Sequence, residues 1–351
     1  PYSIVPSGFP CGAGHGSTFS DKSGNLWHAS TVCVGVNHNF ERRLGLWPAG
    51  VDKDGLLFCN QYFADYPKNI PDGKFDPLTV EPDSWQKSWM GRCMARPSPP
   101  VSANPLAKPQ TPLTPAACAS SSRSGFDPQN AFDESIKSAW SATSGNSGEW
   151  LSVDLGKEYN VEAVQVNFAD CFTKKKRAPM KEYGGTFTQE RYIEEELVRY
   201  EYRIEYSSNG TDWAPYEETQ NTVFPHKLIP RRARARYIRI VFASAPYGQN
   251  FSISGLRVFG LGGGEKPSAV SGENAERTSA TEARLSWNSQ NDAMGYCIRL
   301  GIAPDKLYNS ILLYGQNDYT VTFLNKETEK YYFVVDSFNE SGITKGSINE
   351  F

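Results

Sequence analysis

The sequence predicts an all-β protein built from short strands and tight turns. Its 351 residues include 30 glycines and 23 prolines, and 13% of all residues are aromatic. Aromatic residues favour strands, whereas glycine and proline favour the turns that join them. Several segments also alternate apolar and polar residues with the two-residue period of a half-buried strand. We therefore expect two or three β-domains rather than a helical fold.

Bulk properties exclude several classes of partner. The formal net charge of −3 creates no field that would steer the chain to nucleic acid. No apolar run reaches the length of about 18 residues that a membrane-spanning helix needs. The seven cysteines are dispersed without a Cys-x-x-Cys pair, which argues against a disulfide framework and a cysteine zinc site. We expect no nucleic acid, no membrane insertion, and mostly free or buried thiols.

Two breaks in composition divide the chain. Residues 95–116 contain seven prolines, which indicates an extended connector, because proline cannot donate to a central sheet. Residues 261–266 (LGGGEK) predict a short flexible hinge. The predicted domains are therefore residues 1–113, 114–261 and 262–351.

The first segment predicts successive β-hairpins. The turns Asp21–Gly24 and Asp52–Gly55 lie 31 residues apart, with Asp and Gly at the ends that type I-based hairpin loops prefer. Backbone hydrogen bonding in these turns explains Asp21, Asp52 and Asp54. A segment of about 100 residues supplies only one or two blades of a β-propeller. Since an isolated part of a ring would expose edges and apolar faces, we expect an N-terminal part of the propeller to be missing from this chain.

The other two segments predict β-sandwiches. In the second segment, Tyr200, Tyr202, Ile204 and Tyr206 alternate with Glu201, Arg203 and Glu205, so that the two sets face opposite sides of a strand. Further strands are expected around residues 149–156, 236–242 and 254–259, with a turn at 207–213. The third segment shows short strands around residues 283–287, 295–299 and 331–335, a spacing that suits a small immunoglobulin-like sandwich.

The second segment resembles a discoidin, or coagulation factor 5/8 C-terminal, domain. The residues that carry the resemblance occur in the order typical of that family: Asn130–Asp133, Trp140, Glu149–Gly156, Asn209–Trp213, Ala235–Arg239 and Leu256–Gly260. The resemblance implies an eight-stranded jelly-roll sandwich. Many such domains bind carbohydrate through loops at one end.

The flanking segments resemble two other families. In the third segment Trp287, Leu324, Tyr331–Val335 and Asn339–Gly342 resemble fibronectin type III. The first segment resembles the C-terminal end of the five-bladed propeller of glycoside hydrolase family 43, through Gly14–Phe19, Gly24–His28, Phe40–Arg43, Pro48–Gly50 and Asp52–Phe58. Together they imply the C-terminal portion of a secreted, periplasmic or cell-surface enzyme, an inverting arabinosidase or xylosidase that acts on a plant-type polysaccharide or oligosaccharide.

This resemblance implies no catalytic residue within the chain itself. An inverting glycosidase needs two carboxyl groups about 6.5–9.5 Å apart, and in family 43 these come from earlier blades. His15 matches the family's glycine-flanked histidine, which implies a pocket-wall role near a calcium ion or water cluster. A hydrogen-bonded core histidine is the alternative. Arg42 and Arg43 should point to opposite faces of a strand, so that one could reach the pocket, while two purely structural arginines remain the alternative.

The discoidin-like segment carries the remaining candidate residues. No cofactor is required, but Asp133 could hold a structural calcium ion together with backbone carbonyls. Tyr247, Gln249, Asn250 and Phe251 precede the last strand and could form a sugar-binding loop by ring stacking and amide hydrogen bonds.

Two charged stretches of this segment are expected to serve structure. The insertion at residues 170–199 is expected to be a solvated loop that docks on the propeller. The arginines between residues 231 and 239 are expected to pair with surface acids. A non-catalytic fragment that binds carbohydrate or braces the propeller is the alternative to the enzyme interpretation.

Overall fold

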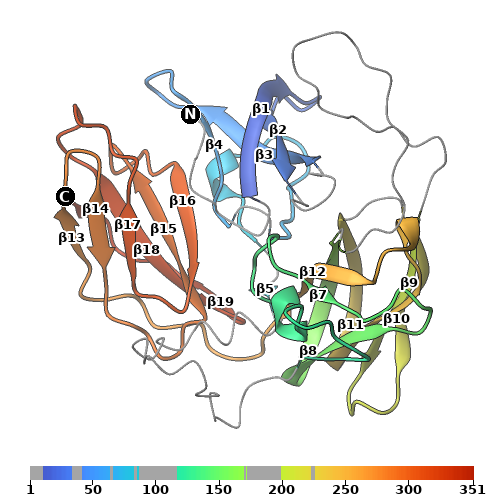
Figure 1. Ribbon diagram of the computed structural model, residues 1–351. Helices are drawn as coiled ribbons and strands as arrows, with labels where there is room; N and C mark the ends of the chain where they lie inside the picture. The colour runs from blue at the N-terminus through green and yellow to red at the C-terminus, as the bar shows by residue number, and fades with distance from the viewer. Residues whose placement is uncertain are drawn as a thin grey trace, which may run out of the picture.

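The computed structural model describes residues 11–33, 42–63, 66–82, 85–86, 117–169, 171, 199–222 and 226–351. Within these ranges the protein is all-β, as predicted, with three short 3-10 helices (Figure 1). The proline-rich connector and the insertion at 170–199, apart from residues 171 and 199, lie outside the described residues.

The N-terminal unit, residues 11–86, contains a four-stranded antiparallel sheet in the order β1-β2-β3-β4. Its elements are β1 (Cys11–Ser20), β2 (Leu26–Cys33), β3 (Arg42–Val51), β4 (Leu57–Cys59), η1 (Pro77–Thr79) and β5 (Trp85–Gln86). Both predicted turns are present, and Gly24 and Gly55 adopt the left-handed φ values of 77° and 81° that they require. A sheet of four consecutive strands has the topology of one propeller blade. The propeller itself stays a prediction.

The central sandwich, residues 117–261, is built around two long strands. Its elements are β6 (Ala117–Ala119), η2 (Pro128–Ala131), β7 (Trp140–Ser141), β8 (Trp150–Phe168), β9 (Tyr200–Ser207), β10 (Ala214–Thr222), β11 (His226–Ser244), η3 (Pro246–Gly248) and β12 (Ser252–Leu261). β8 and β11 have 19 residues each and pair along most of their length, with irregularities that bend them. Their inward residues form one core with Trp140, Phe242 and Leu256. The alternation predicted for β9 is confirmed, since Tyr202 and Ile204 are buried and Arg203 is exposed.

One strand of the N-terminal unit joins the central sandwich. β5 pairs antiparallel with β12, with Gln86 opposite Phe259 and Trp85 opposite Gly260. These two residues lie inside the first predicted domain, 1–113, yet they extend the sheet of the second. The pairing joins positions more than 170 residues apart, which no local sequence pattern indicates.

The C-terminal sandwich, residues 267–351, contains two sheets. Its strands are β13 (Asn274–Arg277), β14 (Ala283–Ser286), β15 (Gly295–Gly301), β16 (Asn309–Tyr314), β17 (Asp318–Val321), β18 (Tyr332–Asn339), β19 (Gly342–Thr344) and β20 (Asn349–Glu350). β13, β14 and β17 form one sheet, and the remaining five strands form the other. Trp287 is buried in the core between them. The Tyr331 hydroxyl accepts a hydrogen bond from the Asn325 N–H at 2.7 Å, the contact of a tyrosine corner.

The glycine-rich linker between the two sandwiches is anchored by hydrogen bonds at Gly262 and Gly264, and its role as a flexible hinge stays a prediction. The Gly262 N–H donates to the Glu340 carbonyl at 2.5 Å, and the Gly264 N–H donates to the Ser341 hydroxyl at 3.1 Å. A side chain at position 262 would lie 2.7 Å from the Glu340 carbonyl oxygen. The absence of a side chain at Gly262 therefore permits close backbone packing at this position.

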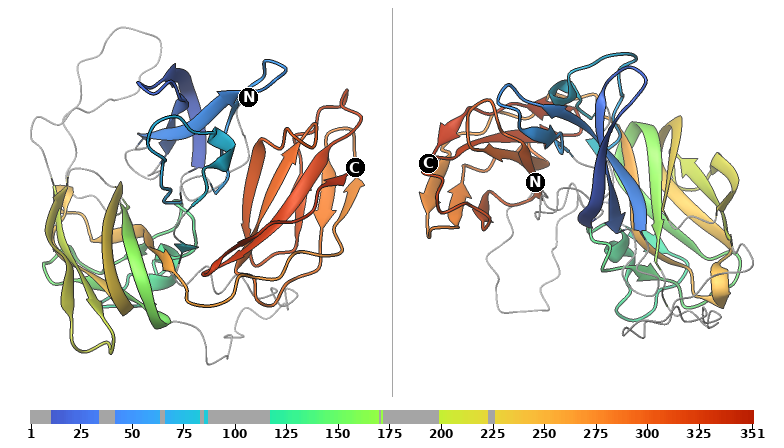
Figure 2. Two further views of the ribbon diagram at one scale, coloured as in Figure 1. Left: turned by 180° about the vertical axis from the view of Figure 1, so that it is seen from behind. Right: turned by 90° about the horizontal axis from the view of Figure 1, so that it is seen from above.

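The N-terminal unit lies between the two sandwiches. Figure 1 shows its blue sheet flanked by the orange-red C-terminal sandwich and the green-yellow central sandwich, and the view from above in Figure 2 agrees. A separate apolar cluster fills the junction, with members from all three parts of the chain: Tyr62, Phe63, Tyr66, Ala163, Phe259, Met294, Cys297, Leu312, Tyr314, Phe338 and Ile343.

Candidate functional site

His15 lies in β1 at an irregularity of the β1–β2 ladder, between Gly14 and Ser17. Its backbone has a left-handed φ of 50° and its side chain is exposed in this chain, and both the pocket-wall role and the core alternative stay predictions. Gly16 leaves room for a different histidine, because a Cβ at position 16 would lie 2.6 Å from the His28 ring. His28 is half-buried and hydrogen-bonds Thr18 at 3.1 Å, and burial lowers its pKa.

Arg42 and Arg43 occupy the start of β3. Arg42 is the register partner of Cys33, and Arg43 is the partner of Val32. Their side chains lie outside the part of the chain that the structure describes, so a role in a pocket wall stays a prediction. No residue of this chain is predicted to supply the catalytic carboxylates that these arginines would accompany.

The structure corrects the predicted sugar-binding loop. Gln249, Asn250 and Phe251 are 2%, 3% and 1% exposed. The Gln249 amide donates to the Tyr200 hydroxyl at 2.9 Å, and the Asn250 amide donates to the Ala142 carbonyl at 2.8 Å. Phe251 stacks on Phe242 with 4.3 Å between ring centroids. These three side chains hold the end of the sandwich together and cannot reach a glycan. The side chain of Tyr247, in η3, lies outside the described residues.

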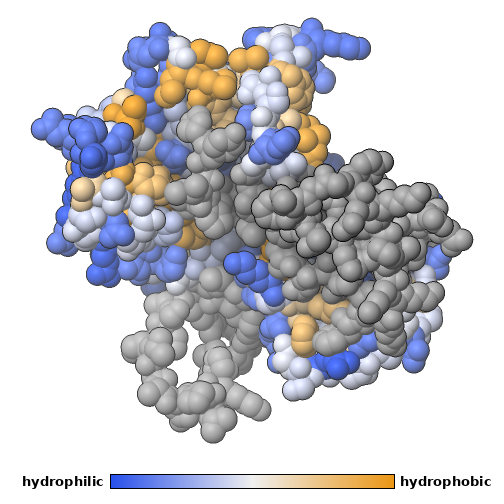
Figure 3. All heavy atoms as spheres, turned by 45° about the horizontal axis from the view of Figure 1, so that its top comes forward, coloured by the Kyte–Doolittle hydropathy of each residue, from blue (hydrophilic) through white to orange (hydrophobic). Residues whose placement is uncertain are grey.

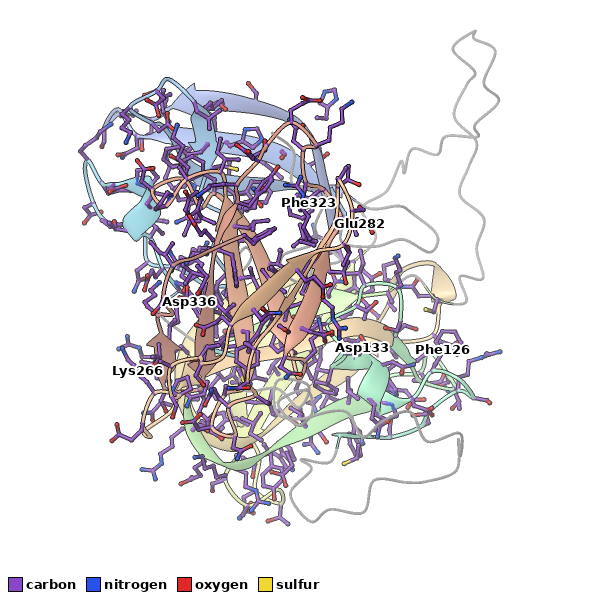
Figure 4. All side chains as sticks on the ribbon, turned by 90° about the vertical axis from the view of Figure 1, so that its left-hand side faces the viewer. Phe126, Asp133, Lys266, Glu282, Phe323 and Asp336 are labelled. Carbon is purple, nitrogen blue, oxygen red and sulfur yellow. The ribbon has the colours of Figure 1, made fainter. Side chains whose placement is uncertain are left out.

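Asp133 forms the hydrogen-bonded turn that follows η2, shown beside Phe126 in Figure 4. Its carboxylate accepts the Ser135 N–H at 3.0 Å and the Ser138 hydroxyl, while burial raises its pKa. The neighbouring Glu134 pairs with Arg257, 3.1 Å away. Calcium would need several charged oxygens here. Among the described residues, no three His, Cys, Asp or Glu side chains converge as metal ligands. A calcium ion at Asp133 stays a prediction.

Glu149 joins two loops at one end of the central sandwich, residues 120–127 and 142–149, and the sequence assigned it no role beyond its family motif. Its carboxylate accepts hydrogen bonds from Ser120, from Ser121 at 2.8 Å and from Ser144 at 2.7 Å. Burial would raise the pKa of this carboxyl, but the three serine hydroxyls outweigh it and lower the pKa. Gly145 lets the loop of residues 142–149 approach a third loop, residues 245–251, since a Cβ at position 145 would lie 2.4 Å from the Gln249 carbonyl oxygen. The result is a fixed loop end with a polar surface.

The surface of this loop end, which we call the loop rim, consists of the exposed residues of the first two loops. Its exposed members are Ser122, Arg123, Ser124, Thr143, Asn146 and Ser147. They carry hydroxyl, amide and guanidinium groups, all of which can hydrogen-bond sugar hydroxyls. Trp150, at the start of β8, is half-buried, and its backbone N–H donates to the Ser120 hydroxyl at 2.9 Å. The loop rim is therefore a small polar surface at one end of the central sandwich.

Four of the five arginines of β11 pair with acids, as predicted. Arg232 lies 2.7 Å from Glu162, Arg236 lies 2.8 Å from Asp154, and Arg239 lies 2.5 Å from Glu205. Arg234 pairs with Glu158 at 3.1 Å. These pairs neutralise one another along the sheet. The row of arginines therefore offers no uncompensated basic stripe for a polyanion.

Comparison with known families finds one match, and it lies in the central sandwich. Residues 116–192 match the family described as "F5/8 type C domain". The match covers the first half of the sandwich and supports the discoidin resemblance that the motifs indicated. Within the described residues, no helix has the length and apolar character that crossing a membrane would require. No curated protein sequence matches the chain.

Several solved structures that are similar to part of the chain come from carbohydrate-active proteins. Chitosan-binding module 1 of a chitosanase/glucanase from Paenibacillus sp. IK-5 is 22% identical over 42% of this chain and 96% of that module, with a TM-score of 0.32. The CBM32 of AlyQ, in complex with 4,5-unsaturated mannuronic acid, is 19% identical over 41% and 93%, with a TM-score of 0.31. A family 89 glycoside hydrolase from Clostridium perfringens is 18% identical over 43% of this chain and 14% of that enzyme, with a TM-score of 0.32.

Proposed function

We propose that the F5/8 type C domain of this chain binds carbohydrate, and that the chain is the C-terminal portion of a secreted, periplasmic or cell-surface glycoside hydrolase. The match of residues 116–192 to the F5/8 type C family carries the proposal. The polar loop rim supports it, because its exposed side chains present donors and acceptors without a net excess of either. The proposed ligand is a plant-type polysaccharide or oligosaccharide.

The loop rim would recognise sugar hydroxyls by side chains rather than by an aromatic platform. Arg123 supplies a planar guanidinium that can bridge two neighbouring hydroxyls, and Asn146 supplies an amide that both donates and accepts. Thr143 lies between them in the chain and is also exposed. Because Glu149 fixes the loops beneath, these groups are held in place before a ligand arrives, which lowers the entropic cost of binding.

The enzyme part of the proposal concerns residues upstream of this chain. An inverting reaction on arabinose- or xylose-containing polysaccharide would draw its two carboxyl groups from earlier blades of a propeller. An apolar face of the N-terminal sheet supports this view: Phe19, Leu44 and Leu46 are 45%, 68% and 51% exposed. Apolar patches reach the surface at the top of Figure 3. A neighbouring blade would cover such a face.

A purely structural role is the second candidate, and the buried Gln249, Asn250 and Phe251 favour it. Affinity electrophoresis of the whole chain through gels that contain arabinoxylan or arabinan separates the two. Binding predicts slower migration than in a gel without polysaccharide, lost in the double variant Arg123→Ala/Asn146→Ala and kept in Arg232→Ala, an exposed arginine of β11. Unchanged migration in every polysaccharide would leave only the structural role.

An assay with aryl-arabinosides and aryl-xylosides tests the enzyme part. We expect no sugar release from this chain alone, and release once the upstream propeller residues are joined to it. Robust turnover by the chain alone would show that the active site lies within it, against the proposal.

A further inference from the structure

The face of the C-terminal sandwich that meets the N-terminal unit is built as a specific docking surface. Resemblance to fibronectin type III implies little more than a spacer for this domain. The contacts indicate otherwise, because two separate segments of the N-terminal unit fit it. One is the β3–β4 turn, Asp52–Gly55, which we call the charged turn. The other is the aromatic wedge, the described residues Tyr62, Phe63 and Tyr66.

The charged turn fits its partner by alternating charge. Lys306 of the C-terminal sandwich contacts two acids of the turn, Asp52 at 3.0 Å and Asp54 at 2.5 Å. Between them, Lys53 reaches Asp305 at 2.7 Å. Both acids of the turn thus face Lys306, and the lysine between them faces Asp305, so that each charge meets an opposite charge. Such a pattern selects one register of docking and disfavours a slipped one, which would place like charges together.

The docked position of Asp52 also fixes the turn itself. One carboxylate oxygen accepts the N–H groups of Asp54 and Leu56, and the other accepts the Tyr308 hydroxyl at 3.1 Å. Tyr308 in turn stacks on Phe58 of β4 with 4.3 Å between ring centroids. The side chains of Asp52 and Lys306 are only 8% and 11% exposed. This ion pair is therefore a shielded contact rather than a solvated surface pair.

The aromatic wedge enters the space between the two sandwiches. Phe63 is completely buried and packs edge-on against Phe338, 4.9 Å between centroids. Its backbone has a φ of 52°, in the left-handed region that a bulky residue adopts only when its surroundings hold it there. Tyr66 packs against Phe259 of the central sandwich and hydrogen-bonds Tyr314 of the C-terminal one. The wedge therefore contacts both partners at once.

Polar groups at the base of the wedge are matched as well. The Tyr62 hydroxyl donates to Asp336 at 2.8 Å, and Asp336 is fully buried inside the C-terminal sandwich, as labelled in Figure 4. Lys345 donates to the Tyr62 hydroxyl at 2.9 Å and to Glu81 at 2.6 Å. Without the N-terminal unit, Asp336 and Lys345 would both lose a partner, which is costly for a buried carboxylate.

A hollow of about 350 Å³ lies along the same seam, lined from the N-terminal side by Tyr62 and Glu81 and from the other side by Arg299, Tyr308 and Lys345. Its charged groups already hold one another: Arg299 contacts Asp336 at 2.8 Å and Lys345 contacts Glu81. Because these charged groups pair with one another inside the protein, the hollow is better explained as part of the interface than as a ligand site.

We propose that the C-terminal sandwich is the permanent docking partner of the N-terminal unit, recognising its charged turn and aromatic wedge, so that the three parts of the chain behave as one body. The proposal goes beyond carbohydrate binding and does not depend on it. Its consequence is that a glycan held by the central sandwich would be presented to the N-terminal unit in a fixed direction.

Cleavage of the folded chain at the linker tests this proposal. A protease site inserted between Gly263 and Gly264 removes the covalent link to residues 264–351, and position 263 has room, because no described atom lies within 4 Å of a Cβ there. We expect both pieces to co-elute in size-exclusion chromatography after cutting. Phe63→Ala should weaken the association of the pieces by about 100-fold or more, as expected for a lost buried aromatic ring. Separation of the unmutated pieces at low micromolar concentration would overturn the proposal.

Charge reversal provides a test that does not disturb the core. Lys53→Asp and Asp305→Lys, both exposed, should each weaken association by about 3- to 10-fold, and the double variant should restore it. Arg284→Glu serves as the control. Arg284 pairs with Asp318 within the sheet of β13, β14 and β17, which is the other sheet of the same sandwich. Equal effects of Arg284→Glu and the single reversals, or no restoration in the double variant, would contradict recognition by the charged turn.

Discussion

At the scale of single residues, the junction depends on charges that are buried and matched. Arg257 of β12 is 1% exposed and contacts Glu134, 3.1 Å away, and Gln165, 2.7 Å away. Its guanidinium also lies 5.4 Å from the Tyr66 ring centroid. The pair Arg257–Glu134 thus supports the junction from the side of the central sandwich. Removing one member of such a pair leaves an uncompensated buried charge.

Glu134→Gln should therefore lower the free energy of unfolding by about 3 kcal/mol, measured by urea denaturation. Glu158→Gln is the matched control, because Glu158 forms an exposed pair with Arg234, and we expect a loss of at most about 0.5 kcal/mol. Equal losses in the two variants would show that burial of the Arg257 charge is unimportant.

The sequence predicted the turn carboxylates well, and one of them gives a pH dependence. Hydrogen bonds from the Trp27 indole and the Asn25 amide lower the pKa of Asp21 to about 2, against an ordinary value of 3.8. The folded state therefore keeps this carboxylate charged at a pH where the unfolded chain takes up a proton. The resulting stability is present above about pH 4 and is lost as the pH falls towards about 2.

Asp21→Asn keeps a hydrogen-bond acceptor in the turn but removes the ionisable group, and with it the difference in pKa between the folded and unfolded states. We expect the urea midpoint of this variant to fall less between pH 5 and pH 2 than that of the unmodified chain, with Asp318→Asn, an exposed carboxylate of β17, as the control. A fall as steep as in the control would mean that the Asp21 turn does not contribute to acid sensitivity.

At the scale of elements, the strands with strict alternation could be predicted, as β9 shows, because each has one buried face and one solvated face. The aromatic wedge and β5 could not, because their partners are far away in the sequence and their own patterns are too short to carry a period. The prediction of a sugar-binding loop before β12 was wrong for another reason. An amide next to an aromatic residue is typical of a sugar-binding loop and equally of a buried loop anchor, and only burial distinguishes them.

Gly145 tests the packing of the loop end. A methyl group there would lie 2.4 Å from the Gln249 carbonyl oxygen, which belongs to the backbone and cannot swing away. Gly145→Ala should cost about 1–3 kcal/mol of stability and weaken retention by polysaccharide, because the loop must shift. Gly263→Ala, with open space around it, should change neither property. Unchanged thermal stability of Gly145→Ala would contradict the close approach of the two loops.

At the scale of the whole molecule, the central sandwich, whose first half matches the F5/8 type C family, lies beside a blade-like sheet, and the C-terminal sandwich holds that sheet on its other side. The pocket-wall roles of His15, Arg42 and Arg43 stay predictions. The N-terminal unit supplies a turn and a wedge for docking, whereas the polar loop rim that could meet a glycan belongs to the central sandwich. Function is therefore proposed for the loop end, and rigidity for the junction.

A glycan array probed with the whole chain tests carbohydrate recognition most directly. We expect binding to oligosaccharides that contain arabinose or xylose, and we expect it to be lost in Arg123→Ala/Asn146→Ala and retained in Arg232→Ala. Absence of binding across the array, or binding that the loop-rim double variant leaves unchanged, would contradict a carbohydrate-binding role of the loop rim.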